Sequence, residues 1–461
     1  MDSPLAVVAH RLADWPRRVR DVATTPRLSR SEILRRLARY DFTHPCTLQD
    51  VVGDMADLLE GGTLHSTHPR YFGLFNPGVR AAGVVADALA ALYNPQVGAW
   101  WHAPAAAEVE RHTLGYFQRR IGFGGPKTSA SFTTGGSEAN LTGVLAGLAR
   151  AFPEFVTRGL QAIGRHPVFY GSDQAHDSFV KIASVTGLGR EAFRRVVSDA
   201  RRRMDVGALR QAIARDRADG HAPFLVIGTA GTTATGAIDP LPQLAALCAT
   251  EDLWFHVDAA WGGLAVLSDT LPGCVAGIER GDSITLDAHK VLPVPMGAGM
   301  FFSRGGAPAD TVFAAHTGYV PDPEQGTRDA YQHTLQWSRR FIGLKVFVTL
   351  AELGEAGVAA LVEHQIAMAN LLRVELARAG WRIINDTPLP LVCFTRDGLP
   401  PAAAAAIARA VAAGGAAWVS ELRLINGTHA LRACITHHET GPEDIRALID
   451  ALARAAASTP A

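Results

Sequence analysis

Residues 223–260 read PFLVIGTAGTTATGAIDPLPQLAALCATEDLWFHVDAA and give the first indication of the architecture. Two short apolar runs, 223–230 and 253–260, flank the segment LPQLAALCATED, which carries helix signals. Further β-rich runs lie on either side: SASFTT (129–134), HPVFYGS (166–172), SITLDAH (283–289) and GMFFSR (299–304). Short strands that alternate with helices predict a mostly parallel sheet with helices on its faces. In such a sheet ligands bind at the carboxyl ends of the strands, so polar residues just after the strands are candidate site residues.

The segments outside this region divide the chain further. Helical spacing occurs in SRSEILRRLARY (29–40), where Ser29 or Ser31 caps the helix, in TLQDVVGDMADLLEGG (47–62) and in VRAAGVVADALAALY (79–93). A long helical stretch (341–380), possible strands at 390–395 and 431–437, and an Ala-rich helix (400–415) follow the predicted sheet. We therefore expect a helical N-terminal segment (1–85), a large α/β domain (86–345) and a smaller C-terminal α/β domain (346–461).

Composition excludes several classes of protein. Lys and Arg together number 44, as do Asp and Glu, so the chain lacks the basic excess of a nucleic-acid-binding protein. The five cysteines form no CxxC pair, so we expect buried free thiols and predict no metal site. No basic, apolar signal segment is visible at the N-terminus, and the apolar run Ala81–Tyr93 is too short to cross a bilayer. A cytoplasmic protein without a membrane or nucleic-acid partner is expected.

The segment TTGGSEAN, residues 133–140, lies between a predicted strand and the helical LTGVLAGLAR. Gly135 and Gly136 allow the backbone to approach an anion closely, and a helix N-terminus supplies N–H groups and a positive dipole end. Ser137 adds a hydroxyl group. The alternative is an ordinary strand–helix turn with a capping serine. Neither GxxxxGK[ST] nor GxGxxG occurs, so a P-loop or a Rossmann nucleotide site is not predicted.

Three further polar residues follow predicted strands. Asp258, in HVDAAWGG, is expected to be partly buried and to need a cationic partner such as a protonated ring nitrogen, unless it caps the next turn. Lys290, in DAHK, precedes an apolar segment and is a candidate nucleophile for a Schiff base, whereas a lone lysine more commonly snorkels to the surface. His176, in SDQAHDS, is placed to stack on a flat ring or to move a proton, or else is an ordinary loop residue.

These segments recur in a characteristic order: HPRYFGLFNP, APAAAEVE, TTGGSEAN, SDQAHDS, GTTATGAIDPL, HVDAAWGG, DAHK and QWSRRFIGLK. They extend from His68 to Lys345, with a weaker match in LRACITHHETGPEDI. The chain thereby resembles the fold-type I pyridoxal 5'-phosphate (PLP) enzymes and, more closely, the group II amino-acid decarboxylases, which include the aromatic-L-amino-acid and glutamate decarboxylases. The resemblance implies a fold-type I α/β architecture, PLP as cofactor, and conversion of an L-amino acid to an amine and CO2.

The resemblance also implies roles for individual residues. Lys290 would hold PLP as a Schiff base, Asp258 would pair with the protonated ring nitrogen, and His176 would stack on the ring, so that electrons left by CO2 enter the ring as a quinonoid. The other cofactor-binding residues would surround the phosphate or line the ring: Gly135, Gly136, Ser137, Thr232, Ala260, Asp287 and His289. Asp287 stands where the family often has Asn.

Proton donor and substrate contacts are less directly indicated. In the family, a Tyr on a mobile loop after the Schiff-base lysine protonates Cα, and Tyr331 is the candidate here, with Tyr319 in reserve. The segment 316–333 is rich in Gly, Pro and charge, as a lid would be. Trp100 and Phe72 are candidate substrate residues that suggest an apolar or aromatic substrate, unless they pack the N-terminal segment against a partner subunit.

Alternatives on the same fold remain. Another PLP-dependent carbon–carbon lyase or an aldehyde-forming relative would share Lys290, Asp258 and His176. An aminotransferase would need an Arg that grips the α-carboxylate, and Arg432 either does so or supports the small domain. Because active sites of this family lie at a dimer interface, the resemblance implies a homodimer.

Overall fold

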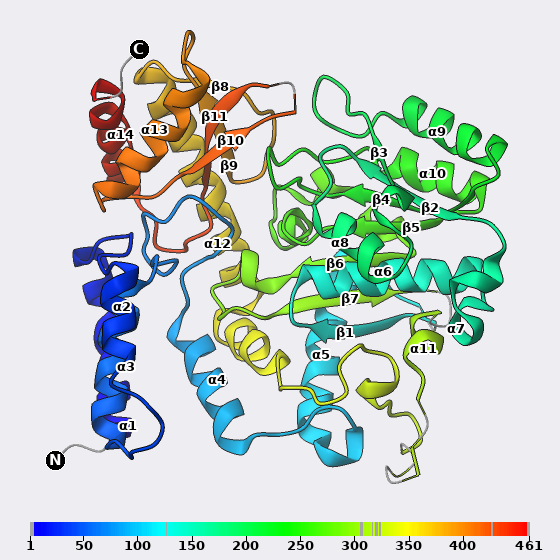
Figure 1. The fold of residues 1–461 in the computed structure, drawn as a ribbon, viewed down its shortest axis with the longest axis horizontal. Helices are drawn as coiled ribbons and strands as arrows, with labels where there is room; N and C mark the ends of the chain where they lie inside the picture. The colour runs from blue at the N-terminus through cyan, green and yellow to red at the C-terminus, as the bar shows by residue number, and fades with distance from the viewer. Residues whose placement is uncertain are drawn as a thin grey trace. The chain divides into compact units, whose positions relative to one another are not determined.

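The computed structural model describes residues 4–125, 127–304, 308–315, 317–318, 321, 324–425 and 427–458. Its contacts divide the chain into two compact units. Unit 1 comprises Met1–Ala81, Ala367–Ile384 and Val392–Ala461, and unit 2 comprises Ala82–Ile366 and Asn385–Leu391. Figure 1 shows the elements of both units along the chain.

Unit 2 is built on a mixed, mostly parallel sheet. Among the described residues it has seven strands in the order β1-β7-β6-β5-β4-β2-β3. Strands β6, β5, β4, β2 and β3 run parallel, whereas β7 is antiparallel to both of its neighbours, β6 and β1. The bounds are β1 Ser129–Thr133, β2 Pro167–Ser172, β3 Phe193–Val196, β4 Ala222–Thr229, β5 Trp254–Asp258, β6 Ser283–Asp287 and β7 Gly299–Ser303.

Helices cover this sheet (Figure 1). The helix α6 (Gly136–Ala151) packs across β4, β5, β6 and β7, while α9 (Val206–Ala218) and α10 (Leu241–Glu251) pack on β4. The helix α5 (Pro104–Ile121) packs on β1, and α8 (Ser178–Val185) packs on α6. All residues of β2, β5, β6 and β7 are buried, as expected for strands covered on both faces. The other helices of this part of the chain are α4 (Ala81–Tyr93), α7 (Phe155–Arg158) and α11 (Pro308–Phe313).

Unit 1 combines helices from both ends of the chain with a second sheet. Within the described residues this sheet has four strands in the order β10-β11-β9-β8, namely Ser420–Arg423, His429–Cys434, Leu391–Thr395 and Arg382–Ile383. The helices are α1 (Pro4–Arg18), α2 (Arg30–Leu37), α3 (Leu48–Gly62), α13 (Pro401–Ala413) and α14 (Pro442–Ala457). The helix α12 (Gly343–Arg378) begins in unit 2, continues into unit 1 and breaks at Gly354, whose φ of 63° is the left-handed conformation that favours glycine.

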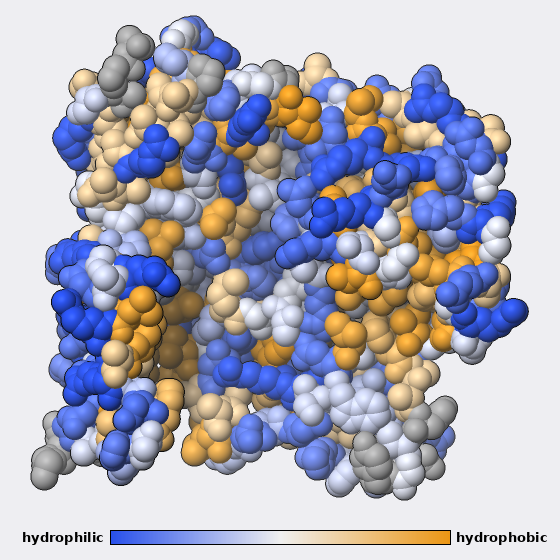
Figure 2. Space-filling model, in the orientation of Figure 1, coloured by the Kyte–Doolittle hydropathy of each residue, from blue (hydrophilic) through white to orange (hydrophobic). Residues whose placement is uncertain are grey.

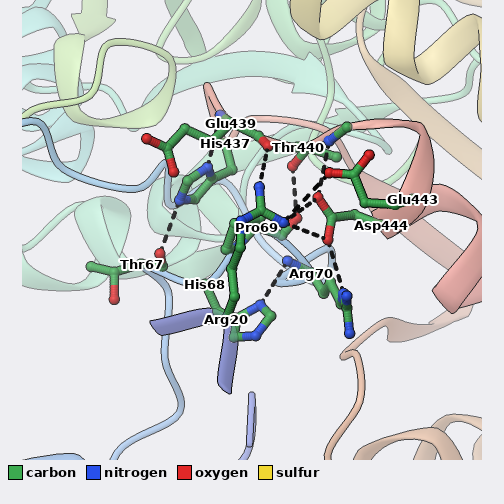
Figure 3. Close-up of polar contacts among 11 residues, drawn as sticks. Arg20, Thr67, His68, Pro69, Arg70, His437, Glu439, Thr440, Glu443 and Asp444 are labelled. Atoms are coloured by element: carbon green, nitrogen blue, oxygen red, sulfur yellow. Dashed lines mark hydrogen bonds and ion pairs between the residues drawn. The ribbon is translucent and has the colours of Figure 1, made fainter. Parts of the chain in front are cut away.

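A buried carboxylate joins the two ends of the chain inside unit 1 (Figure 3). The side chain of Asp444 is 0% exposed and accepts from Arg20 Nη1 at 3.0 Å, Arg70 Nε at 2.8 Å and the Gly441 backbone N–H at 3.0 Å. These hydrogen bonds lower the pKa of Asp444 against the opposing effect of burial. Asp444 therefore caps the N-terminus of α14 and links this helix to the N-terminal segment through ion pairs with Arg20 and Arg70.

The structure contains the predicted mostly parallel sheet with helices on its faces, and its two compact units divide the chain differently from the three predicted segments. The predicted N-terminal segment (1–85) and the predicted C-terminal domain (346–461) both contribute to unit 1. Phe72 from the first packs in the same core as Phe394 and Ile435 from the second. Ser29, not Ser31, caps α2, through a capping box with Glu32.

Two further expectations from composition can be compared with the structure. The five cysteines are free thiols, but Cys46 is exposed and Cys274 half-buried, so the expectation of burial is wrong for these two side chains. Cys46 lies in the irregular segment before α3, and Cys274 lies in a short 3₁₀ helix, Pro272–Val275, so neither belongs to a covered strand. Across the ranges given above, no helix has the length and apolar character needed to cross a membrane.

Candidate active site

The carboxyl ends of β5 and β6 bring Asp258, Asp287 and Lys290 to one edge of the sheet. Asp258 is paired with Thr285 in the register of the two strands, and the Asp287 N–H donates to the Ala260 carbonyl at 2.9 Å. Lys290 follows β6 in a short 3₁₀ turn, and its Nζ lies 2.9 Å from Asp287 Oδ2. The Lys290 side chain is 26% exposed, so its amine is paired with a carboxylate and still reaches solvent.

The N-terminus of α6 meets the same edge. A Cβ on Gly136 would lie 2.8 Å from Asp287 Oδ2 and 3.3 Å from Ala260 Cβ, which only a glycine tolerates without displacement of its neighbours. A Cβ on Gly135 would lie 3.7 Å from His289 Cε1. The helix starts without a side-chain cap, and Ser137 in its first turn is exposed. The first-turn N–H groups and the positive end of the helix dipole thus lie beside Asp287 and His289, as an anion site requires.

Asp258 is held from the inside of the protein. Its side chain accepts from Asn140 Nδ2 at 3.0 Å and from the Ala260 backbone N–H at 3.2 Å. The second bond is the turn-capping contact that the sequence left as an alternative. Asn140 Oδ1 in turn lies 3.0 Å from His256 Nε2. Burial lowers the pKa of His256 to about 4, although Asp258 opposes the shift, so this imidazole is neutral.

Other predicted residues follow neighbouring strands on the same edge. His289 is 5% exposed, its Nδ1 accepts from the Ala298 N–H at 3.1 Å, and burial lowers its pKa. Thr232 follows β4 and is fully buried, with its hydroxyl group accepting from the Ala237 N–H at 3.1 Å. His176 follows β2, is exposed, and accepts from the Ser178 N–H at 3.2 Å through Nδ1.

Trp100 and Tyr331, the predicted substrate residue and proton donor of unit 2, lie on two segments that contact each other. The Trp100 backbone N–H donates to Asp329 Oδ1 at 2.7 Å, and the Tyr331 backbone N–H donates to the Gly98 carbonyl at 2.9 Å. Tyr331 is 6% exposed and packs its ring on Trp337 at a centroid distance of 4.7 Å. These contacts bring the segments of Trp100 and Tyr331 together. Tyr319 lies outside the described residues.

Phe72 and Arg432 belong to unit 1. Phe72 is 0% exposed and lies in the hydrophobic core of that unit, as a packing residue does. Arg432 is 5% exposed, stacks its guanidinium over the Phe75 ring at 4.9 Å and donates from Nη2 to Cys434 Sγ at 3.2 Å. Its Nε is buried without a hydrogen-bond partner in the part of the chain that the structure describes.

Sequence reasoning assigned no role to Asn140, His256 or Ser283. The first two stand inside quoted motifs, TTGGSEAN and HVDAAWGG. One signal was available: His256 and Asp258 are two apart on a strand and so face the same side of the sheet. Two polar residues on one face of an otherwise apolar strand indicate a buried polar network.

Comparison with known proteins assigns the chain to a family. The family model described as "Pyridoxal-dependent decarboxylase conserved domain" matches residues 33–396. The chain belongs to this family. It is therefore a PLP-dependent amino-acid decarboxylase, with PLP as its cofactor.

Individual relatives of this decarboxylase act on different substrates. It is 33% identical to an aromatic-L-amino-acid decarboxylase of Bacillus atrophaeus, over 72% of this chain and 68% of the relative. It is 30% identical to an L-2,4-diaminobutyrate decarboxylase of Acinetobacter baumannii, over 70% of this chain and 66% of that protein. An acidic amino acid decarboxylase of Bos taurus is also similar, at 29% identity. The family thus determines the reaction and leaves the substrate open.

Solved structures of the family have the same fold. The crystal structure of Oryza sativa TDC with PLP and tryptamine matches with a TM-score of 0.92 at 21% identity, covering 98% of this chain and 97% of that one. The crystal structure of mouse CSAD matches with a TM-score of 0.89 at 22% identity, covering 99% of both chains. These likenesses confirm the fold-type I α/β architecture of the decarboxylase.

The described residues fit PLP. Asp287 Oδ1 is buried without a hydrogen-bond partner among the described residues, Gly136 lets the start of α6 approach this carboxylate closely, and Lys290 Nζ is a primary amine at that point of the sheet. A free helix N-terminus suits a phosphate, and the buried carboxylate of Asp258 suits a cationic ring nitrogen.

Proposed function

We propose that the decarboxylase acts on an L-amino acid with an apolar or aromatic side chain and that Lys290 carries the cofactor. The observation that carries this proposal is the convergence of Lys290, Asp287 and Gly136 at the ends of β6 and β1, next to Asp258 at the end of β5. It supplies an amine, a phosphate site and a buried carboxylate at one edge of the sheet.

Each residue then has a task. PLP, when bound, supplies an electron-accepting ring to the carbon that loses CO2. Lys290 Nζ would hold the cofactor through its primary amine, which lies 2.9 Å from Asp287 Oδ2. Asp258 holds a proton on the ring nitrogen through its carboxylate, which Asn140 and the Ala260 N–H fix in place. Gly135, Gly136, Ser137 and His289 bind the phosphate; Thr232 and Ala260 line the ring, and His176 stacks on it.

In this proposal Tyr331 donates the proton to the Cα atom of the substrate. Tyr331 is anchored through its backbone to Gly98, and Gln332 Nε2 donates to its hydroxyl oxygen at 3.0 Å, which leaves the phenolic proton available for donation. Tyr319 is the second candidate.

The substrate class rests on Trp100 and on one group of relatives. Trp100 is half-buried and lines a cavity of about 220 Å³ in unit 2 together with Glu108, Arg111 and His333. Trp100 Nε1 donates to Glu108 Oε1 at 3.1 Å, so the indole is fixed by a polar contact and offers its apolar face. The aromatic-L-amino-acid decarboxylase of Bacillus atrophaeus supports the same choice. Phe72, whose side chain is wholly buried in the core of unit 1, adds no support to the substrate class.

Arg432 favours one alternative reaction. Its buried guanidinium makes no ion pair with any described residue, which is unusual because buried charges are normally paired. An aminotransferase requires an arginine that binds the substrate carboxylate, and this reaction stays an alternative. Another carbon–carbon lyase and an aldehyde-forming relative share the rest of the site, and the product distinguishes all of them.

We also propose a homodimer. The helix α4 exposes four large apolar side chains, namely Val85, Leu89, Leu92 and Tyr93, and Figure 2 shows apolar residues among polar ones where this helix lies. A neighbouring groove of about 490 Å³ in unit 2 is lined by Leu89, Tyr93 and Phe341. A second copy of the chain would cover this surface. Light scattering on the purified protein measures its mass in solution and so tests whether the chain is a dimer. The cytoplasmic location stays a prediction.

The test is CO2 release by the PLP-loaded protein from each common L-amino acid, with identification of the organic product. Release from aromatic amino acids, with the amine as product, is expected. Lys290→Ala is the matched control: it should abolish both the visible absorbance of the lysine-bound cofactor and CO2 release, while the circular dichroism stays unchanged. Release only from aspartate, glutamate or diaminobutyrate would refute the substrate class, and a 2-oxo acid product would favour the aminotransferase. Full activity of Lys290→Ala would refute the assignment of Lys290.

A further inference from the structure

Behind Asp258 lies a chain of four hydrogen bonds through buried side chains. Trp254 Nε1 donates to Ser283 Oγ at 2.8 Å, and Ser283 Oγ lies 2.8 Å from His256 Nδ1. His256 Nε2 lies 3.0 Å from Asn140 Oδ1, and Asn140 Nδ2 lies 3.0 Å from Asp258 Oδ2. Each of these five residues is at most 5% exposed, so water does not compete for the bonds.

The two ends of this chain fix the direction of every bond in it. Ionised Asp258 can only accept, so Asn140 must turn its amide N–H₂ toward the carboxylate and its oxygen toward His256. Neutral His256 must then carry its proton on Nε2, and its Nδ1 must accept from the Ser283 hydroxyl. Trp254, which can only donate, fills the remaining acceptor position of Ser283. The Thr285 hydroxyl, 3.4 Å from His256 Nε2, is a weaker second contact of the same ring nitrogen.

The opposite orientation of the Asn140 amide would leave a buried group without a partner. With its oxygen toward the Asp258 carboxylate, Asn140 would present N–H₂ to His256 and move the imidazole proton to Nδ1. Ser283 would then receive two donors, from His256 and from Trp254, and its own proton would lose its partner. Because a buried donor without a partner is costly, the arrangement from Trp254 to His256 favours the orientation in which Asn140 donates to Asp258.

We propose that Asn140, His256 and Ser283 are positioning residues that hold the Asp258 carboxylate in place and aim it at the ring nitrogen of the cofactor. The proposal rests on the role of Asp258 given above. The imidazole is held tightly for this task, because a Cβ on Gly143 of α6 would lie only 2.5 Å from His256 Cε1. Phe179 contacts the same ring edge-on, at a centroid distance of 6.3 Å.

The first experiment reads the tautomer of His256 by ¹⁵N NMR of the histidine-labelled holoenzyme, with the resonance assigned by its loss in His256→Gln. The neutral Nε2–H tautomer is expected. A neutral Nδ1–H tautomer, or a protonated ring at neutral pH, would overturn the proposal without the need for any destabilising variant.

The second experiment compares His256→Gln with His256→Leu. Gln offers one acceptor and one donor, as the Nε2–H tautomer does, whereas Leu offers neither. Affinity is measured by titration of the full-length apoprotein with PLP and with an analogue that has C–H in place of the ring nitrogen. His256→Leu should weaken PLP binding by about 10- to 100-fold, because it leaves the buried Asn140 oxygen without its donor and frees the amide that holds Asp258, while His256→Gln stays close to wild type.

The analogue separates positioning from packing. Without a ring nitrogen the two variants should bind with nearly equal affinity, because Asp258 then has no partner to hold. Equal losses in both variants with PLP, or a Gln–Leu difference that persists with the analogue, would overturn the positioning role. Failure of the wild-type protein to bind PLP would instead refute the proposed function, so the two failures are distinguishable.

Discussion

Replacing His437 by Gln should make unit 1 less sensitive to acid. In the Asp444 region, His437 Nε2 donates to the Thr67 carbonyl at 2.9 Å, and Nδ1 accepts from the Glu439 N–H at 3.0 Å (Figure 3). The side chain is 3% exposed, and burial lowers the pKa of His437 to about 4. Arg20 lowers this pKa further, while the Thr67 carbonyl and Asp444 oppose the shift.

The magnitude follows from the two pKa values of His437. The folded value is about 4, below the unfolded value of 6.5, so the unfolded chain binds the proton first as the pH falls. The stability that neutral His437 contributes is complete above the unfolded pKa and is lost as the pH falls through the interval from 6.5 toward 4. Between pH 7.5 and pH 5 this loss amounts to about 2 kcal/mol. Gln can make both hydrogen bonds and does not titrate.

The assay is equilibrium urea unfolding of wild type and His437→Gln at both pH values. The loss of unfolding free energy between pH 7.5 and pH 5 should be about 2 kcal/mol smaller in the variant. His10→Gln is the matched control, because His10 is exposed on α1 and its replacement should leave the loss unchanged. An equal loss in wild type and in His437→Gln would refute the reasoning, whatever the variant's stability at a single pH.

Three further outcomes are expected. Gly136→Val should weaken PLP binding by about 1–3 kcal/mol in equilibrium dialysis, because its Cβ would lie 2.8 Å from Asp287 Oδ2, whereas Gly53→Ala, with no atom within 4 Å, should not. Asp444→Ala should destabilise unit 1 by about 3 kcal/mol in urea unfolding, since it removes the ion pairs of Arg20 and Arg70 with this carboxylate and uncaps α14; no loss would contradict the joining role of this carboxylate. Tyr331→Phe should slow or divert protonation of the product carbon, and an unchanged rate and product would exclude this hydroxyl.

The candidate site could be predicted where its residues follow strands. Asp258, Asp287 and Lys290 end or follow β5 and β6, and parallel strands bring such positions to one edge of a sheet whatever the details of packing. The hydrogen-bond chain behind Asp258 could not be predicted, because Asn140 belongs to α6 and Ser283 to another strand. Their distances to Asp258 depend on how the helix packs on the sheet.

Aromatic residues show the limit of sequence reasoning most clearly. Phe72 and Trp100 both come from aromatic-rich segments before the predicted sheet, yet the structure puts the first wholly in the core of unit 1 and the second half-buried beside a cavity of unit 2. Apolar character predicts burial for both and does not say against which partner.

The sequence by itself determined the α/β class, the ends of the strands and the order of the chemical residues, because periodicity and turn residues act locally along the chain. Only the tertiary structure decided that the two ends of the chain share one unit and that Asp258 is backed by His256 through Asn140. These are contacts between residues far apart in sequence. Local patterns do not encode such contacts, because the packing of whole elements against each other creates them.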